Sequence, residues 1–575
     1  MYHLDIEVFK YDICVGFKEH DKANYKFYWN RDAAEPLRHY HETQDIIVTY
    51  NGLHYDLPLI YNYYCNPHNT ANAFELSDFI INQHYELRYP KDYWNGIDLM
   101  FLLQGWIGLK VIEAIMGWEI RETTIDFRYQ YKLTEEQRRE VEHYNKQDLD
   151  ASNALYNKML SHINMRLSLA KYLNIEHDFS IPVPTLMGMG LGAHRKPTSP
   201  IPLHEECINI PIKNPIKEKM LAQMKKPSSE FSEDFTMGDK EYTIANGGLH
   251  SKLKCWSGHD VYHVDVKGYY SLIMIHFKLF SRNIPEKGVE LYKQMYEDRL
   301  RLKATGKPED TLTADSLKIG LLAIWGATRN YHHILYDRFV GELITLYGEL
   351  FLMYLIELFT DNNINVINAN TDGLIVTGDI KVIQEQIKVW QAYHDFDVEI
   401  EQYKRFIQKD VNNYILGNSL NKLKVKGRDF TAIKYDWLFA NIVSIPQIPV
   451  VSTLLSEILY QSEDDIDPEK YVRSRIKDYP VNYYMFIIHH TMKFDGMKYE
   501  ESDREIQKTN RVYAHKEGET VVKFKGENTY KYPGLPLTRE CNEDLTTVNK
   551  DDLDIDYEWY VDEVMRKYVT YYGEV

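Results

Sequence analysis

Short apolar runs near the start of the chain predict strands that bring acidic residues together. Residues 2–9, Tyr-His-Leu-Asp-Ile-Glu-Val-Phe, have the pattern of a strand, and Asp5 and Glu7 point to the same face of it. A second apolar run at 46–50 ends in a turn that supplies Asp56. Two acids on the inner face of an apolar strand are costly unless a cation neutralises them, so the pattern indicates a metal site.

A helix over 134–160 adds two further polar groups. Thr134 and Gln137 have the spacing of a capping box, which predicts where the helix begins. Tyr144 and Asp148 lie four residues apart, so they share one face of this helix.

A second pair of acids is predicted further along the chain. Residues 364–376 read as a β-hairpin whose tight turn, Asn370-Thr371-Asp372-Gly373, presents the carboxylate of Asp372. A strand in the stretch 261–275 delivers Asp265 before a Tyr-rich turn. Two carboxylates on adjacent strand ends suit two Mg²⁺ ions that clamp the attacking and leaving oxygens of a phosphoryl transfer. For Asp372 alone, a turn that only closes a hairpin is the alternative.

Two amphipathic helices carry cations at helical spacing. The helix over 289–304 has Arg299 and Lys303 at i, i+4, and the helix over 312–328 places Lys318 and Trp325 on one face. On an antiparallel helix pair these cations would form a funnel for a triphosphate. Solvated helix cations are the alternative for any one of them.

The composition is that of a folded protein with several domains. The chain has 575 residues, of which 44% are hydrophobic and 26% are charged. The apolar run Leu350–Phe359, in a helix expected at 341–359, is too short for a membrane span and carries Glu357, so it reads as a core helix. Five scattered cysteines without a C-x-x-C pair argue against zinc and disulfides. The same cysteines indicate an intracellular, reducing setting, and because the chain starts in a strand, no signal sequence is expected.

The net charge of −18 at first sight opposes a nucleic-acid partner, since phosphate binding depends mainly on Lys and Arg. Carboxylate metal sites would contribute to this total, and the basic residues are clustered. The clusters are Lys404, Arg405 and Lys409, and then Lys422, Lys424, Lys426 and Arg428. A solvated basic surface is the alternative for each cluster taken alone.

Three motifs in the first 150 residues resemble those of the DEDDy 3′→5′ exonucleases that proofread for DNA polymerases. They are D-x-E at 5–7, N-x₃-Y-D at 51–56 and Y-x₃-D at 144–148. The resemblance implies that two metal ions are held by four acids, Asp5, Glu7, Asp56 and Asp148. It also implies that Tyr144 orients the attacking water and that Asn51 and Tyr55 grip the 3′ end of single-stranded DNA. Leu109-Lys110 is similar to a further strand-gripping position, and Arg121 is the candidate for a basic residue of these enzymes.

Two later stretches resemble metal-binding motifs of family B DNA polymerases. Residues 265–271, Asp-Val-Lys-Gly-Tyr-Tyr-Ser, are similar to motif A, with Gly268 and Ser271 departing from its pattern. The resemblance implies that Asp265 binds metal and that the ring of Tyr270 excludes a ribose 2′-hydroxyl. Residues 370–373 are similar to motif C, with Asp372 as the metal ligand and an asparagine in place of the first acid.

The helix over 312–328 is similar to motif B of the same family, with Lys318 and Gly326 in register, Leu322 in place of an asparagine and Trp325 in place of a tyrosine. This implies that Lys318, together with Arg299 and Lys303, holds the triphosphate. It further implies that Trp325 backs the base pair.

Two further matches concern contacts with DNA. Residues 245–248, Ala-Asn-Gly-Gly, resemble the Y-x-G-G linker of the family without its tyrosine, and Gly247 and Gly248 would let the backbone approach DNA. An ordinary turn is the alternative. Tyr414 stands where the family has K-x-Y against the primer strand, and Lys424 or Lys426 would supply the missing charge.

Together the motifs resemble a family B DNA polymerase of the small bacteriophage type. The fold implied is α/β and α+β multidomain, with a ribonuclease H-like exonuclease domain followed by a right-hand polymerase. The Pro-rich stretch 181–202 suits a boundary. The expected regions are the exonuclease domain at 1–185, linker and first part of the palm at 186–285, fingers at 286–330, second part of the palm at 331–430, and thumb and C-terminal region at 431–575.

The implied activity is template-directed DNA synthesis from dNTPs with 3′→5′ proofreading, using two Mg²⁺ per site, with Mn²⁺ as a substitute. The implied partners are primer-template DNA, single-stranded DNA and replication accessory proteins, but no membrane. A monomer in the cytoplasm, that of the host if the chain comes from a phage, is expected. The large insertions of protein-primed phage polymerases are missing, which implies an ordinary nucleic-acid primer.

Two other functions are compatible with parts of the pattern. One is an exonuclease whose polymerase half has become a DNA-binding module, which Asn370, Leu322 and the missing lysine near Tyr414 favour. The other is a processivity or scaffold protein without activity, which retention of all four exonuclease acids opposes. Incorporation of labelled deoxynucleotide on a primer-template separates DNA synthesis from both.

Overall fold

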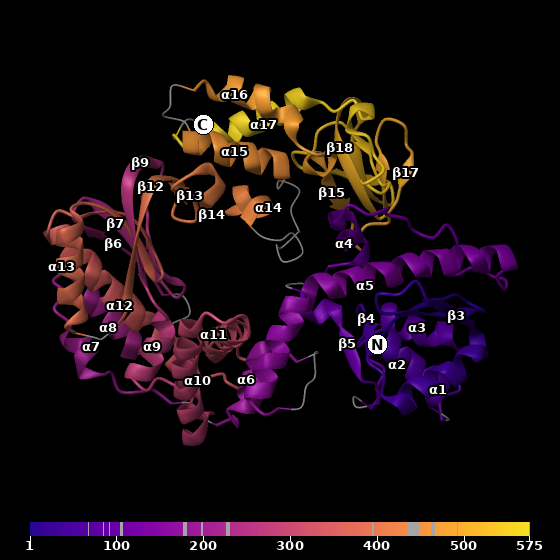
Figure 1. The fold of residues 1–575 in the computed structure, drawn as a ribbon, viewed down its shortest axis with the longest axis horizontal. Coiled ribbons are helices and arrows are strands. Elements are labelled where there is room, and N and C mark those ends of the chain that lie inside the picture. The colour runs from indigo at the N-terminus through magenta and orange to yellow at the C-terminus, as the bar shows by residue number, and fades with distance from the viewer. Residues whose placement is uncertain are drawn as a thin grey trace.

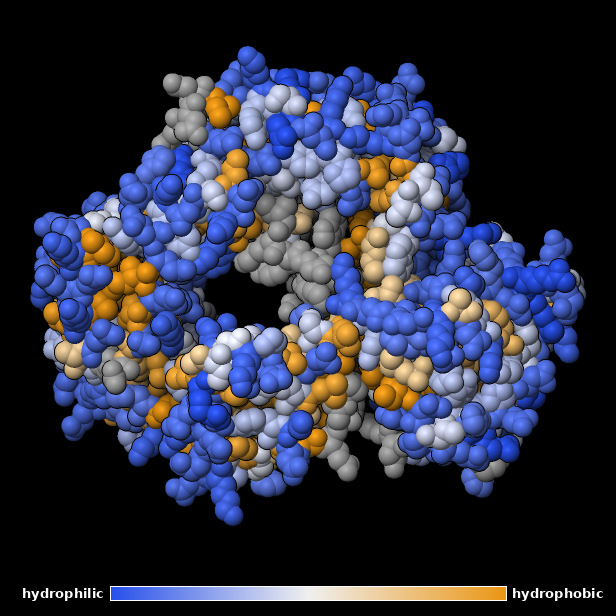
Figure 2. All heavy atoms as spheres, viewed as in Figure 1, coloured by the Kyte–Doolittle hydropathy of each residue, from blue (hydrophilic) through white to orange (hydrophobic). Residues whose placement is uncertain are grey.

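The computed structural model describes most of the chain. The described residues are 1–66, 68–83, 86–90, 93–103, 107–175, 181–196, 199–225, 231–393, 396–434, 448–461, 466–491 and 493–573. Figure 1 shows three regions placed around the centre of the molecule, and Figure 2 shows an opening between them.

The N-terminal region is a five-stranded sheet with helices. The strand order is β3-β2-β1-β4-β5, in which β1 is antiparallel to β2 and parallel to β4. The strands are β1 (Tyr2–Val8), β2 (Ile13–Glu19), β3 (Tyr25–Trp29), β4 (Ile47–Thr49) and β5 (Gly96–Asp98). The helices are α1 (Ala34–Thr43), α2 (Asp56–Ile60), α3 (Ala73–Ile81), α4 (Leu109–Met116) and α5 (Glu135–Tyr172).

Helix α5 begins where the sequence predicts it. Thr134 is the N-cap, and the reciprocal bonds between Thr134 and Gln137 complete the capping box. The helix runs to Tyr172, twelve residues beyond the predicted end at 160. Its last turns, with Leu169 and Ala170 buried, pack into the core of the next region. Contacts with residues that are distant in the sequence therefore stabilise the helix beyond residue 160.

The middle region contains a nine-stranded antiparallel sheet in the order β14-β13-β12-β9-β11-β10-β8-β7-β6. Its strands are β6 (Ser232–Met237), β7 (Lys240–Ala245), β8 (Gly248–Ser251), β9 (Trp256–Val266), β10 (Asn365–Asn370), β11 (Gly373–Thr377), β12 (Val398–Asp410), β13 (Asn413–Gly417) and β14 (Leu423–Lys426). The hairpin predicted at 364–376 is confirmed as β10 and β11.

Helices cover this sheet and extend from it. They are α6 (Val183–Gly190), α7 (Glu205–Asn209), α8 (Ile216–Lys225), α9 (Tyr269–His276), α10 (Glu286–Thr305), α11 (Pro308–Thr328), α12 (Arg338–Asp361) and α13 (Ile380–Gln391). α10 and α11 form an antiparallel pair, and α11 packs against α5 and α6. α12 is long and apolar enough to cross a membrane, but 94% of its most apolar window is buried inside the protein, so it is a core helix, as predicted.

The C-terminal region combines helices with two small sheets, whose strand orders are β15-β18-β21 and β17-β16-β19-β20. The helices are α14 (Thr431–Lys434), α15 (Pro449–Gln461), α16 (Pro468–Arg475) and α17 (Tyr557–Thr570). The strands are β15 (Phe486–His489), β16 (Gly496–Tyr499), β17 (Glu505–Ile506), β18 (Thr509–Glu519), β19 (Val521–Lys525), β20 (Asn528–Lys531) and β21 (Thr538–Glu540). Its core includes Ile407 and Ile415 of the large sheet, so the two regions share a packed boundary.

Candidate active sites

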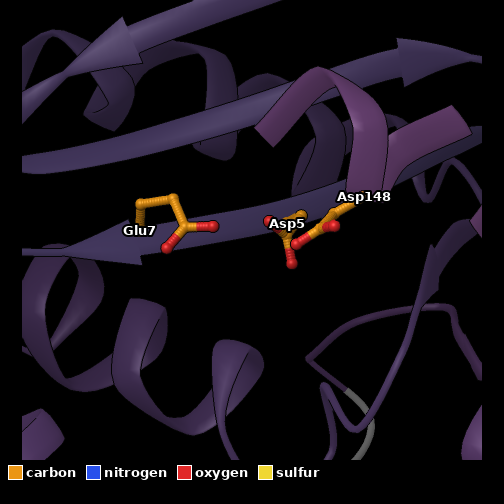
Figure 3. Close-up of side chains that lie close together, drawn as sticks. All are labelled: Asp5, Glu7 and Asp148. Carbon is orange, nitrogen blue, oxygen red and sulfur yellow. The ribbon is translucent and has the colours of Figure 1, made fainter. Parts of the chain in front are cut away.

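The first candidate site lies between β1 and α5. Side-chain oxygens of Asp5, Glu7 and Asp148 all lie within 4.8 Å of one another. Figure 3 shows Asp5 of β1 beside Asp148 of α5, with Glu7 further along the same strand. Burial raises the pKa values of Asp5 and Glu7 well above their usual range, and neighbouring acids raise them further. Hard carboxylate oxygens grouped in this way fit a divalent cation such as Mg²⁺.

Close packing of α5 on the sheet brings the acids together. Asn145 is buried and donates from Nδ2 to Asp5 Oδ2 at 2.6 Å. It lies directly over Gly16 of β2, where a Cβ atom would be 2.9 Å from Asn145 Cγ and closer still to its Oδ1. A glycine is therefore needed for this approach. Neither residue stands out in the sequence pattern.

Asp56, the fourth predicted acid, is buried at the start of α2. It is not in the group of three, but its charge contributes to the raised pKa values of Asp5 and Glu7. Burial, followed by the charge of Asp98, raises the pKa of Asp56 to about 8.

Asp98, which the sequence analysis missed, shapes the loop before Asp56. It accepts hydrogen bonds from the backbone N–H groups of Asn51 (2.9 Å) and Leu53 (3.0 Å). Asn51 has a φ of 63°, which non-glycine residues rarely adopt. Asp98 is the last residue of β5, a three-residue strand whose one apolar side chain, Ile97, is too little to give an alternating pattern.

The two predicted strand-gripping side chains differ in their surroundings. The Oδ1 atom of Asn51 is buried, and the described part of the chain gives it no hydrogen-bond partner. The Tyr55 hydroxyl lies 2.8 Å from Ser77 Oγ, so it is already engaged within the domain.

Lys110, predicted to lie at a strand-gripping position, lies among the acids of the first site. Arg121, the predicted basic residue of this site, is exposed. The Nζ of Lys110 contacts Asp148, lies 3.1 Å from Glu113 Oε1, and sits 4.4 Å from the centre of the Tyr144 ring. Burial opposes its charge, but Asp148 and Glu113 outweigh burial and raise the pKa of Lys110. Burial, and then the charge of Asp148, also raises the pKa of Tyr144, so its hydroxyl stays protonated.

The second candidate site lies on the nine-stranded sheet. Asp265 of β9 is paired with Gly373 of β11 on one side and with Glu399 of β12 on the other, and Asp372 is in the adjoining turn. Burial, and then the charge of Asp372, raises the pKa of Asp265 to about 6. Burial also raises the pKa of Asp372. Two crowded, desolvated acids, one on a strand and one in the adjoining turn, are suited to holding divalent cations.

Further acids, which the sequence analysis missed, lie on β12. Glu399 and Glu401 both raise the pKa of Asp265. Their alternation along β12 matches that of Asp265 and His263 on β9, so the residues share a face.

Asn370, in the position of the missing acid, has a structural role. Its Nδ2 donates to Val411 O and to Asn412 Oδ1, both at 3.1 Å. These bonds tie the hairpin to the turn between β12 and β13.

Tyr270 lies next to this site and stacks on Trp325 of α11, with ring centroids 4.1 Å apart and planes 8° apart. The adjacent Tyr269 points elsewhere, since its hydroxyl donates to Gly348 O at 2.6 Å. Of the two adjacent tyrosines, Tyr269 and Tyr270, it is therefore Tyr270 that faces α11.

The predicted phosphate-binding cations lie on α10 and α11. Arg299 is half-buried, and Lys303 and Lys318 are exposed. Among the described residues, neither Lys303 nor Lys318 is paired with a carboxylate. Leu322, on the same helix as Lys318, is 46% exposed.

The residues predicted to contact DNA take different places around the sheet. A Cβ atom at Gly248, whose φ is 131°, would come within 3.0 Å of Thr371 Oγ1, whereas one at Gly247 would have no heavy atom within 4 Å. Gly248 thus lets its turn approach the Asp372 turn, and Gly247 has open space.

Lys424 and Lys426, the two lysines predicted to supply charge near Tyr414, also differ. Lys424 forms an ion pair with Glu401 at 2.7 Å. Lys426 lies 5.9 Å from the centre of the Tyr414 ring, and its charge opposes the rise in the pKa of Asp372. The charge of Lys426 therefore acts on Asp372, whereas the charge of Lys424 acts on Asp265 and on Tyr414.

Comparison with known proteins bears on the first site. Residues 4–160 match the sequence profile of the RNase H superfamily, a stretch that contains Asp5, Glu7, Asp56 and Asp148. The N-terminal domain is RNase H-like. No curated protein matches the chain. Among solved structures, the chain is similar to the family B DNA polymerase from the hyperthermophilic archaeon Pyrobaculum calidifontis. The identity is 13% and the TM-score 0.44, over 99% of this chain and 77% of that one.

Proposed function

We propose that the protein is a DNA polymerase with a 3′→5′ proofreading exonuclease. The observation that carries the proposal is the presence of two separate acid sites on different sheets, with Asp5, Glu7 and Asp148 at one and Asp265 and Asp372 at the other. Each is surrounded by groups suited to one of the two reactions. The right-hand arrangement of palm, fingers and thumb, in the regions expected from the sequence, belongs to this proposal.

For synthesis, Asp265 and Asp372 would hold two Mg²⁺ ions. When bound, such ions would lower the pKa of the attacking hydroxyl and would neutralise negative charge on the leaving pyrophosphate. Lys318, Arg299 and Lys303 would bind the triphosphate oxygens. The stacked pair of Tyr270 and Trp325 would bound the sugar and the new base pair.

For proofreading, Asp5, Glu7, Asp56 and Asp148 would hold the ions. Tyr144 stays protonated and therefore donates a hydrogen bond to the attacking water. Asn51 would contact the DNA 3′ end; its amide oxygen is buried and has no hydrogen-bond partner among the described residues. Primer-template and single-stranded DNA, dNTPs, accessory proteins, a monomeric state, a phage origin and a cytoplasmic location belong to the same proposal.

The second candidate function is an exonuclease whose polymerase half only binds DNA. The bonds of Asn370 to Val411 and Asn412 favour it, because that side chain is committed to structure. Extension of an annealed primer with labelled dNTPs separates the two functions.

The same assay tests whether the two sites are independent. We expect Asp5→Ala to abolish degradation of single-stranded DNA and to leave extension near normal, since the acids lie on separate sheets. Asp372→Ala should abolish extension and leave degradation. Loss of both activities from either single change in a folded protein would contradict the assignment of two sites.

A further inference from the structure

The C-terminal region contacts the RNase H-like domain at the end of α4 and along the segment that follows it. Ile120 donates its backbone N–H to Asn542 O, and Leu545 donates to Gly117 O, each at 2.8 Å. Apolar side chains also meet here: Ala114 and Ile115 of α4 and Ile487 of β15 line a cavity of about 10 Å³, room for no more than about one water molecule.

Side chains strengthen this junction from both sides. Glu122 accepts hydrogen bonds from the backbone N–H groups of Lys508 (3.0 Å) and Thr509 (3.3 Å). Gln507 donates to Ile120 O at 3.0 Å. The two regions are thus joined by directed polar contacts as well as by apolar packing.

Arg511 of β18 is the central residue of the junction. It is 0% exposed, and its guanidinium donates to the backbone oxygens of Ala114 (3.0 Å) and Trp118 (2.6 Å), at and just beyond the end of α4. It also donates to Cys541 (3.0 Å) and Glu543 in its own region. The last carbonyl groups of a helix lack partners within the helix, and a basic side chain satisfies them well. Arg511 therefore caps a helix that belongs to another domain.

The other end of α4 reaches the first acid site. Lys110 is in the first turn of this eight-residue helix, which is about 12 Å long. Its Nζ contacts Asp148 and Glu113. Because a short helix moves as one rigid element, a shift at its capped end is carried to Lys110.

We propose that Arg511 is a positioning residue for the exonuclease site: it fixes α4 and thereby places Lys110 against Asp148. Docking of the C-terminal region then completes the site in the RNase H-like domain. This inference rests on the proposed exonuclease function.

The test uses the full-length chain with Arg511→Gln, which removes the charge and part of the donor fork. Arg504→Gln is the matched control, because it makes the same change in the same region, where Arg504 pairs with Glu540. Degradation of a single-stranded oligonucleotide and extension of an annealed primer are measured with Mg²⁺. We expect Arg511→Gln to lower kcat for degradation about tenfold or more, with KM and extension little changed. The control should keep both activities.

A double-mutant cycle separates positioning from general damage. If Arg511 acts through Lys110, Arg511→Gln should cause little further loss in a Lys110→Ala background. An equal loss in both backgrounds, or unchanged degradation by Arg511→Gln alone, would overturn the inference.

If Arg511→Gln does not fold, Glu122→Gln weakens the same junction and enters the same cycle. A loss of degradation that disappears in the Lys110→Ala background would support the inference. No effect on degradation, or an equal loss in both backgrounds, would overturn it. A wild-type chain that degrades no single-stranded DNA would instead contradict the proposed function.

Discussion

At the scale of single residues, the stacking of Tyr270 on Trp325 fixes a flat ring beside the acids of the second site. If the protein synthesises DNA as proposed, a ring held in this way would leave no room for a ribose 2′-hydroxyl, whereas a smaller side chain would leave room for it. We therefore expect Tyr270→Ala to raise incorporation of ribonucleotides relative to deoxynucleotides, with some loss of overall rate. Competing extension with rNTPs and dNTPs measures this selectivity.

Tyr269 provides the control for this prediction. Tyr269→Phe removes only the hydrogen bond to Gly348 O, which costs about 1 kcal/mol of stability, and it should leave sugar selection unchanged. If Tyr270→Ala keeps the selectivity of the wild type, another residue excludes the ribose.

At the scale of elements, the approach of α5 to β2 depends on Gly16. We expect Gly16→Ala to push Asn145 away from Asp5, to cost about 1–3 kcal/mol of stability and to lower exonuclease activity. Thermal unfolding and degradation of single-stranded DNA measure the two effects.

Gly96→Ala is the matched control, because a Cβ there would meet its nearest atom at 3.5 Å, an ordinary contact distance. It lies in the same sheet and should change stability much less. Equal effects from the two substitutions would show that the packing of Asn145 does not determine the geometry of the site.

Local patterns predicted the elements that deliver most of the candidate residues. The alternation in β1 places Asp5 and Glu7 on one face, the capping box starts α5, and the hairpin at 364–376 follows from its turn. Each of these signals lies within a few neighbouring residues.

Contacts between distant segments could not be predicted in the same way. Lys110 reaches Asp148 across 38 residues, and Arg511 reaches Ala114 across 397. The far end of α5 likewise depends on packing against α11. Such contacts leave no periodic signal in one sequence.

At the scale of the whole molecule, the chain between the two halves of the second site is short. Between Asp265 and Lys318 it forms only α9, α10 and the first half of α11, and between Gly326 and Asp372 mainly α12 and β10. α9 and α12 pack in the core of the middle region. Little chain is left for an added subdomain that would grip a priming protein or encircle a template.

We therefore expect the protein to extend an ordinary annealed primer, to need no priming protein, and to separate duplex DNA poorly on its own. The measurement compares extension on an open template with extension of the same primer into a downstream blocking strand. The open template is the matched control, because primer, enzyme and site are identical. Efficient unaided displacement through a long duplex, or transfer of a deoxynucleotide onto a protein hydroxyl, would contradict this prediction, because either result would show that the activity does not require an added subdomain.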